Sequence, residues 1–223
     1  MTQEIIILTL PMPFGMGTVN SYLIKNPAGQ ILIDSGVPRA RKALREQLVS
    51  AGFEGDRLRL VLLTHGDFDH IGNAAYLRAC YGVPLAMHRE EACMAERGDM
   101  FANRQKPSAL VRTLVPLFTG FGRAERFCPD TLLEDGSDLL PYGLDARVVW
   151  LPGHSRGSIG VLTANGELFC GDLFENREGP TLNSLLNDTT AAQASAAHLA
   201  GLNIQRVYPG HGQPFAWGEL TKG

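Results

Sequence analysis

Short apolar runs separated by turn residues dominate the first part of the chain. Runs at residues 4–10, 19–25 and 30–34 contain several β-branched residues, and the segments between them contain glycine, proline and asparagine. This pattern predicts three strands in an antiparallel meander. After Pro38, apolar residues recur at helical spacing as far as Gly52, which predicts a helix that covers the sheet.

The middle of the chain continues the alternation of strands and helices and then departs from it. The apolar run at 58–63 predicts a buried strand, which a helix to about Cys80 and a short strand at 83–87 follow. Residues 89–127 contain helical segments broken by glycine and proline. We interpret them as an insertion in a single domain that spans residues 1–223.

The last third returns to strands. Asn165-Gly166 lies between two apolar runs, a pattern typical of a hairpin. The predicted elements are strands at 144–151, 158–164 and 166–171, a helix at about 189–201 and a strand at about 205–208.

Composition adds few constraints. The 223 residues include 20 Lys and Arg against 23 Asp and Glu, so the net charge of −3 gives no sign of whole-surface binding to nucleic acids or membranes. No window approaches the roughly 18–20 apolar residues that span a bilayer. The start of the chain has neither a basic leader nor a small-residue cleavage site. Four scattered cysteines without a Cys-x-x-Cys pair favour a reducing compartment, and we expect a cytoplasmic protein.

Candidate chemistry is concentrated in the stretch Thr64-His65-Gly66-Asp67-Phe68-Asp69-His70, directly after the predicted strand at 58–63. Its four metal-competent side chains could converge in a tight loop but not on a regular strand. The alternative is a polar turn with a helix N-cap, which is a reasonable interpretation for Asp69 alone.

Three more metal-type side chains follow predicted strands. They are His154, Asp172 and His211, each preceded by an apolar run and a glycine that allows a sharp turn. With His65 and His70, four of the six histidines therefore lie in the motif at 64–70 or directly after a strand and a glycine. The repeated pattern of strand, glycine and ligand-type side chain favours a metal-binding role for these residues.

These motifs, in this order, resemble the metallo-β-lactamase-fold hydrolases, including glyoxalase II and lactonases. The resemblance covers nearly the whole chain, from Ile31-Leu32-Ile33-Asp34-Ser35-Gly36 through Pro152-Gly153-His154 to Pro209-Gly210-His211-Gly212. It implies a fold of class α/β, a four-layer αββα sandwich of two mixed β-sheets flanked by helices. A metal site would lie along one edge of this sandwich.

The resemblance also implies the ligand set. His65, the residue at position 67 and His154 would hold one metal; Asp69, His70 and His211 would hold a second; Asp172 would bridge the two. Asp34 would support the site without binding metal. At position 67 the family more commonly has His, and Asp makes the first site richer in oxygen. The resemblance thus implies two divalent metal ions, of which zinc is the first expectation. Iron and manganese are alternatives because of the carboxylate at position 67.

By the same resemblance, the predicted function is metal-dependent hydrolysis of an ester, thioester or lactone by a metal-bound hydroxide. Asp69 would orient this nucleophile or carry a proton to the leaving group. One alternative is a non-haem iron oxidoreductase on the same fold, which a carboxylate at position 67 favours. A second alternative is a phosphodiesterase or nuclease, although the near-neutral charge argues against nucleic acid as a partner.

The predicted insertion has three interpretations. It could be a lid that offers apolar and cationic groups to an anionic small-molecule substrate, a contact in a homo-oligomer, or an amphipathic helix with a solvated basic face. Its basic residues between 104 and 126 are Arg104, Lys106, Arg112, Arg123 and Arg126.

Overall fold

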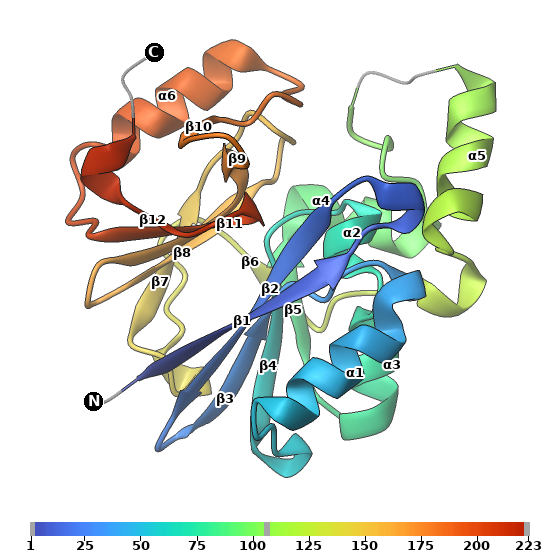
Figure 1. Ribbon diagram of the computed structural model, residues 1–223, viewed down its shortest axis with the longest axis horizontal. Helices are drawn as coiled ribbons and strands as arrows, with labels where there is room; N and C mark the ends of the chain where they lie inside the picture. Colours follow the sequence, from blue (N-terminus) through green and yellow to red (C-terminus); the bar gives the residue numbers. More distant parts are fainter. Residues whose placement is uncertain (1–2, 105–107, 221–223) are drawn as a thin grey trace.

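The computed structural model of the protein describes residues 3–104 and 108–220. Two mixed β-sheets pack face to face, and helices cover the outer face of each (Figure 1). Helices α1 (Arg41–Ser50) and α3 (Ala74–Tyr81) lie against the first sheet, and α6 (Thr189–Leu199) lies against the second. The predicted four-layer αββα sandwich is confirmed.

The first sheet has the order β1-β2-β3-β4-β5-β6. Its first three strands are antiparallel, as the predicted meander requires, and β3 to β6 are parallel. Their bounds are β1 Glu4–Pro11, β2 Thr18–Asn26, β3 Gly29–Ile33, β4 Leu58–Leu63, β5 Leu85–His88 and β6 Thr131–Leu133. The three-residue strand β6 was not predicted, because so short a run shows no period.

Alternate side chains of this sheet enter different layers of the core. On β3, Leu32 packs in the cluster under α1 and α3, whereas Ile31 and Ile33 pack against the second sheet. This alternation follows from the two-residue period of a strand. Each buried aliphatic side chain contributes about 2 kcal/mol through the hydrophobic effect.

The second sheet has the order β12-β11-β9-β8-β7, with β10 paired to β9. The strands β8 and β9 pair antiparallel across Asn165-Gly166, which confirms the predicted hairpin. Their bounds are β7 Ala146–Trp150, β8 Ile159–Thr163, β9 Glu167–Asn176, β10 Thr181–Leu182, β11 Arg206–Gly212 and β12 Phe215–Ala216.

Strands β9 and β11 extend past their predicted ends, so Asp172 and His211 lie within strands and not beyond them. The parallel pairing of these strands shifts register on both sides of Pro209. Gly171 has φ +51°. Such irregularities re-aim side chains without ending the strand, which explains how both residues leave the regular pleat.

The predicted helix up to Cys80 is divided into α2 (Phe68–Ile71) and α3. Between them, the side-chain amide of Asn73 donates hydrogen bonds to the carbonyl oxygens of Ser35 and Val37, at 2.7 and 2.9 Å. Because α2 begins at Phe68, Asp69 lies inside this helix, and its interpretation as a helix N-cap is wrong. At α6, the capping side chain is Asp188, which accepts a hydrogen bond from Ala191 N–H at 2.9 Å.

The segment 89–127 contains α4 (Arg89–Arg97) and α5 (Ala109–Thr119). Helix α5 lies at the edge of the molecule, beside the turn between β1 and β2 (Figure 1). Lys106, one of the predicted basic residues, is outside the described residues. In the described part of the chain, no helix combines the length and apolar character that crossing a membrane requires.

Candidate metal centre

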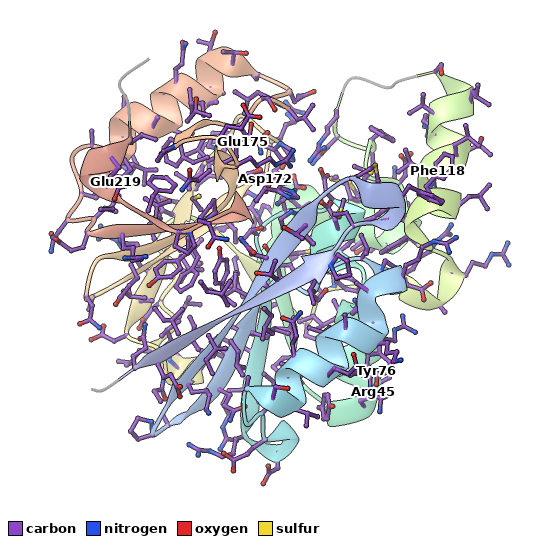
Figure 2. All side chains as sticks on the ribbon, viewed as in Figure 1. Arg45, Tyr76, Phe118, Asp172, Glu175 and Glu219 are labelled. Carbon is purple, nitrogen blue, oxygen red and sulfur yellow. The ribbon has the colours of Figure 1, made fainter. Side chains whose placement is uncertain are left out.

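The seven predicted ligands come from separate segments of the chain and converge at one edge of the two sheets. His65 and Asp67 follow β4, Asp69 and His70 belong to α2, and His154 follows β7. Asp172 lies on β9 and His211 on β11. Figure 2 shows Asp172 on β9, which places the centre between the second sheet and the segment after β4.

The second cluster consists of Asp69, His70 and His211. One ligand atom from each lies within 4.8 Å of the others, a spacing that a single metal ion can bridge. Asp69 Oδ2 is 3.4 Å from His211 Nε2 and 3.9 Å from His70 Nε2. The Asp69 side chain is 16% exposed, so this cluster is open to solvent on one side.

We call the predicted ligands His65, Asp67 and His154 the first cluster. The structure brings the ligand atoms of His65 and His154 within 4.8 Å of one another together with Asp172. Asp67 Oδ2 lies 3.1 Å from His154 Nε2 and 3.7 Å from His65 Nε2. These separations are close to those between two ligands of one tetrahedral ion, whose bonds are about 2.1 Å long.

Asp172 contacts both clusters. Its Oδ1 lies 3.4 Å from His70 Nε2, and its Oδ2 lies 3.4 Å from His211 Nε2 and 4.0 Å from His154 Nε2. The carboxylate therefore lies between the two clusters, where the resemblance placed a bridging ligand.

Backbone carbonyls orient two of the histidines. His154 Nδ1 lies 2.6 Å from the carbonyl oxygen of Leu185, and His211 Nδ1 lies 2.7 Å from that of Thr18. A carbonyl oxygen only accepts, so each Nδ1 carries a hydrogen, and in the neutral ring the lone pair lies on Nε2. Both Nε2 atoms can therefore bind a metal once these rings are neutral.

Asp34 orients the other two histidines. Its Oδ2 lies 2.8 Å from His70 Nδ1 and accepts a 2.8 Å hydrogen bond from Thr64 Oγ1. Because that hydroxyl donates to Asp34, its lone pair accepts from His65 Nδ1 at 3.0 Å. Asp34 has a φ of +60°, in the left-handed region that Asp tolerates better than most residues. This carboxylate therefore contacts the His70 ring directly and reaches His65 through the Thr64 hydroxyl.

The buried polar atoms fit divalent metal ions. His65 Nε2, His70 Nε2 and Asp172 Oδ1 are buried and have no hydrogen-bond partner. Histidines with carboxylates suit zinc, iron and manganese. The centre also gathers five carboxylates around one arginine, and bound cations would offset this excess of negative charge. The carboxylates are the buried Asp34, Asp67, Glu91 and Asp172 and the partly exposed Asp69, and the arginine is Arg104.

The pKa values of His70 and His211 reflect the same excess of negative charge, whereas burial lowers the pKa of His65. Burial alone would lower the pKa of His70, but Asp172, Asp34 and Asp69 raise it to about 9. Burial likewise opposes protonation of His211, whereas Asp172 and Asp69 raise its pKa to about 11. Metal-free protein therefore holds protons at these two rings, and a metal ion would replace that positive charge.

Glu91 is a buried residue of α4 that the sequence motifs do not reveal. Its Oε2 accepts from Gly66 N–H at 2.8 Å, between two predicted ligands of the first cluster. Its Oε1 accepts from Gly157 N–H, in the loop after His154, and from the side-chain amide of Asn103, both at 2.9 Å. One carboxylate thereby joins both ligand loops of the first cluster to the chain that follows α4.

Arg104 is the second feature that the sequence motifs did not place. Its guanidinium contacts the Asp67 carboxylate, with Nη2 2.6 Å from Oδ1 and Nη1 donating to Oδ2 at 3.0 Å. Burial would raise the pKa of Asp67, but Arg104 and the bond to His154 hold it well below the usual range. Of the predicted lid cations, Arg112 instead contacts Asp99, at 2.5 Å.

A cavity of about 430 Å³ lies beside the first cluster. Its lining includes Arg104, Trp150, Arg156 and Asn187, together with the neighbours of His154 in the chain. The cavity thus presents aromatic and cationic side chains next to the metal centre, which Arg104 contacts through Asp67.

Comparisons with known proteins agree with this geometry. The model of the "Metallo-beta-lactamase superfamily" matches residues 14–211. The chain is 29% identical to the "Probable metallo-hydrolase YflN" of Bacillus subtilis, over 87% of this chain and 81% of that one. It is 28% identical to the human "Acyl-coenzyme A thioesterase MBLAC2", over 88% and 74% of the two chains.

Two solved structures share the fold along most of the chain. A metallo-beta-lactamase family protein from Thermus thermophilus, TTHA1429, has a TM-score of 0.70 and 27% identity, over 95% of this chain and 74% of that one. A structure described as "TTHA1623 in a di-iron-bound form" has a TM-score of 0.69 and 28% identity, over 93% and 94%. With its family match, its fold and its convergent histidines and carboxylates, the chain belongs to the metallo-beta-lactamase superfamily.

Proposed function

We propose that the protein is a metal-dependent hydrolase of esters, thioesters or lactones, with one divalent metal in each cluster. The observation that carries the proposal is the common orientation of four histidines. Each has its Nδ1 engaged by an acceptor, so each Nε2 faces the centre in which Asp172 lies. This is the arrangement that holds a metal and fixes the direction of its ligands.

The bound metals would supply a nucleophile derived from water at neutral pH and would polarise the carbonyl oxygen of the substrate. The residues of the chain have separate tasks. Asp172 holds the two clusters at a fixed separation, and Asp34 and Thr64 keep His65 and His70 in the required tautomer. Asp69, the partly exposed carboxylate, is suited to move a proton to the leaving group.

The substrate class rests on the surroundings of the centre. The cavity beside the first cluster offers Arg156 and Trp150 to a small molecule, including one with an anionic group. The name of the human relative supports the inclusion of thioesters. We also propose zinc as the metal, a cytoplasmic location in keeping with four free cysteines, and one domain in which residues 89–127 form an insertion.

The test has two parts. Protein purified without chelators or added metal is subjected to elemental analysis, and about two zinc ions per chain are expected. The same preparation is assayed with an aryl ester, an acyl thioester, a lactone and a phosphodiester. Turnover of a carboxylic substrate that chelation abolishes and zinc restores supports the proposal. Metal-replete protein that turns over only the phosphodiester would instead favour the phosphodiesterase alternative.

A redox function is the second candidate, because a specific feature favours it. Asp67 makes the first cluster richer in oxygen ligands, which favours iron or manganese over zinc, and TTHA1623 is described in a di-iron-bound form. Iron in the purified protein, with oxygen consumption and no hydrolysis of the four substrates, would replace the hydrolase proposal with this one.

A further inference from the structure

Arg104 binds the carboxylate that the first cluster needs for a metal. Its guanidinium contacts both oxygens of Asp67, and the side chains of both residues are only 9% exposed. Asp67 Oδ2, which accepts from Arg104 Nη1, is also the oxygen nearest to His65 and His154. A cation that enters the first cluster therefore competes with Arg104 for the same atom.

The second cluster has no such competitor. In the described part of the chain, the ion pairs of Asp69 and Asp172 involve histidines alone. These histidines can release their protons when a metal binds, whereas arginine keeps its charge at every accessible pH. A metal in the first cluster would thus lie beside a permanent positive charge, and like charges in a buried site repel strongly.

The neighbouring contacts keep Arg104 in place. The side-chain amide of Asn103 donates to the Glu90 carbonyl at 2.6 Å and to Glu91 Oε1 at 2.9 Å. Glu91 in turn accepts from Gly66 N–H, one residue before Asp67. The arginine and the carboxylate are therefore anchored to one hydrogen-bonded unit, so their contact is not an incidental surface pairing.

We propose that Arg104 is a built-in competitor for Asp67 that makes the two clusters unequal, so that the second cluster binds its metal first and more tightly. The inference rests on the proposed metal centre but not on any substrate. Arg104 acts here as a positioning residue for Asp67. Arg104 also lines the cavity of about 430 Å³ beside the first cluster, which offers space for the side chain when a metal displaces it.

The test is a zinc titration of the full chain after removal of metal with a chelator, in competition with a fluorescent zinc indicator. Wild-type protein is expected to show two classes of site that differ about 100-fold in affinity. Arg104→Gln removes the charge and keeps most of the volume, and it should tighten the weaker class about tenfold. Arg104→Lys keeps the charge but loses the two-point contact, so it should tighten the weaker class less than Arg104→Gln does.

The direction of the change separates this role from a merely structural one. If Arg104 only supported the fold, Arg104→Gln would weaken zinc binding, and that result would overturn the proposal. Equal affinities in the wild-type protein would also overturn it. Arg112→Gln is the matched control, because Arg112 contacts Asp99 outside the centre, and both classes should stay unchanged.

A second variant covers the case in which Arg104→Gln does not fold. His154→Ala should abolish the weaker class and leave the tighter one, whereas loss of the tighter class would refute the assignment. Wild-type protein that binds no zinc, manganese or iron would refute the proposed function itself. Two equal sites with hydrolytic activity would refute only the inference about Arg104.

Discussion

The two clusters of the metal centre differ in the parts of the fold that support them. The second cluster is built from α2 and β11, and Asp172 on β9 contacts it as well as the first cluster. The first cluster depends in addition on Glu91 and Arg104, which belong to α4 and the chain that follows it. One cluster is therefore a property of the scaffold, whereas the charge of the other is set by the segment 89–127.

The ligands that bind metal thus differ in origin from the groups that change how strongly the metal binds. The ligands of both clusters follow a pattern common to the whole chain, but only the first cluster, among the described residues, has a carboxylate paired with a fixed cation. Insertions on a rigid scaffold are where functional variation is expected. Substitution of Asp172 should affect both clusters, whereas Gly210 supports the second cluster and Glu91 the first. Cys170 lies outside both clusters.

Asp172→Asn should have the largest effect, because it removes the carboxylate that contacts both clusters. We expect loss of most bound metal and a fall in activity of roughly a thousandfold, equivalent to about 4 kcal/mol of transition-state stabilisation. Elemental analysis and steady-state kinetics measure the two effects, and circular dichroism confirms that the variant is folded. Wild-type metal content would show that Asp172 does not bridge.

Gly210→Ala should act mainly on the second cluster, because it affects His70 and the Asp172 oxygen that faces His70. A Cβ at this position would overlap the Asp172 carboxylate and lie 2.7 Å from His70 Cε1. We expect the tighter zinc site to weaken about 100-fold, because its ligands must move apart. Gly218→Ala is the control, since nothing lies within 4 Å of its Cβ. If both variants bound zinc like wild type, the tight packing around Gly210 would have no role in metal binding.

Glu91→Gln should act mainly on the first cluster. Two backbone N–H groups point at the Glu91 oxygens, and an amide can accept properly from only one of them. We expect about 2 kcal/mol less stability to urea and a first cluster that binds zinc about tenfold more weakly. Glu90 is exposed, so Glu90→Gln serves as the control. An equal loss of affinity at both clusters would contradict the link between Glu91 and the first cluster.

Buried Cys170 should stay a neutral, unreactive thiol at a pH where exposed cysteines ionise, and this property involves neither cluster. Burial raises the pKa of its thiol from 9.0 to about 12, so the folded protein favours the neutral form. Burial of the neutral thiol therefore leaves the stability of the folded protein unaffected by pH below 9. As pH rises from 9 towards 12, the thiol ionises more readily in the unfolded chain, and the free energy of unfolding falls. At about pH 8.5, near the ordinary thiol pKa, an alkylating reagent should modify the exposed Cys80 and Cys128 but spare Cys170. Mass spectrometry of digested protein measures this, and rapid labelling of Cys170 would contradict its burial.

Local patterns predicted most of the fold because they depend on neighbours in the chain. The period of the apolar runs located β4 at its observed bounds, and Asn165-Gly166 marked the hairpin between β8 and β9. The predicted ends of strands and the predicted continuity of helices were less accurate. The bulged pairing of β9 with β11 and the division of α2 from α3 depend on contacts with distant segments, such as that of Asn73 with Ser35.

The sequence by itself determined the candidate ligands, since each histidine or aspartate follows an apolar run whose end can be recognised locally. Only the tertiary structure decided how the two clusters differ. Arg104 lies 37 residues from Asp67, and Glu91 lies 66 residues from Gly157. No local pattern indicates which of several basic residues will meet a given carboxylate. That choice depends on the path of the chain after α4, where packing and buried charge select one contact.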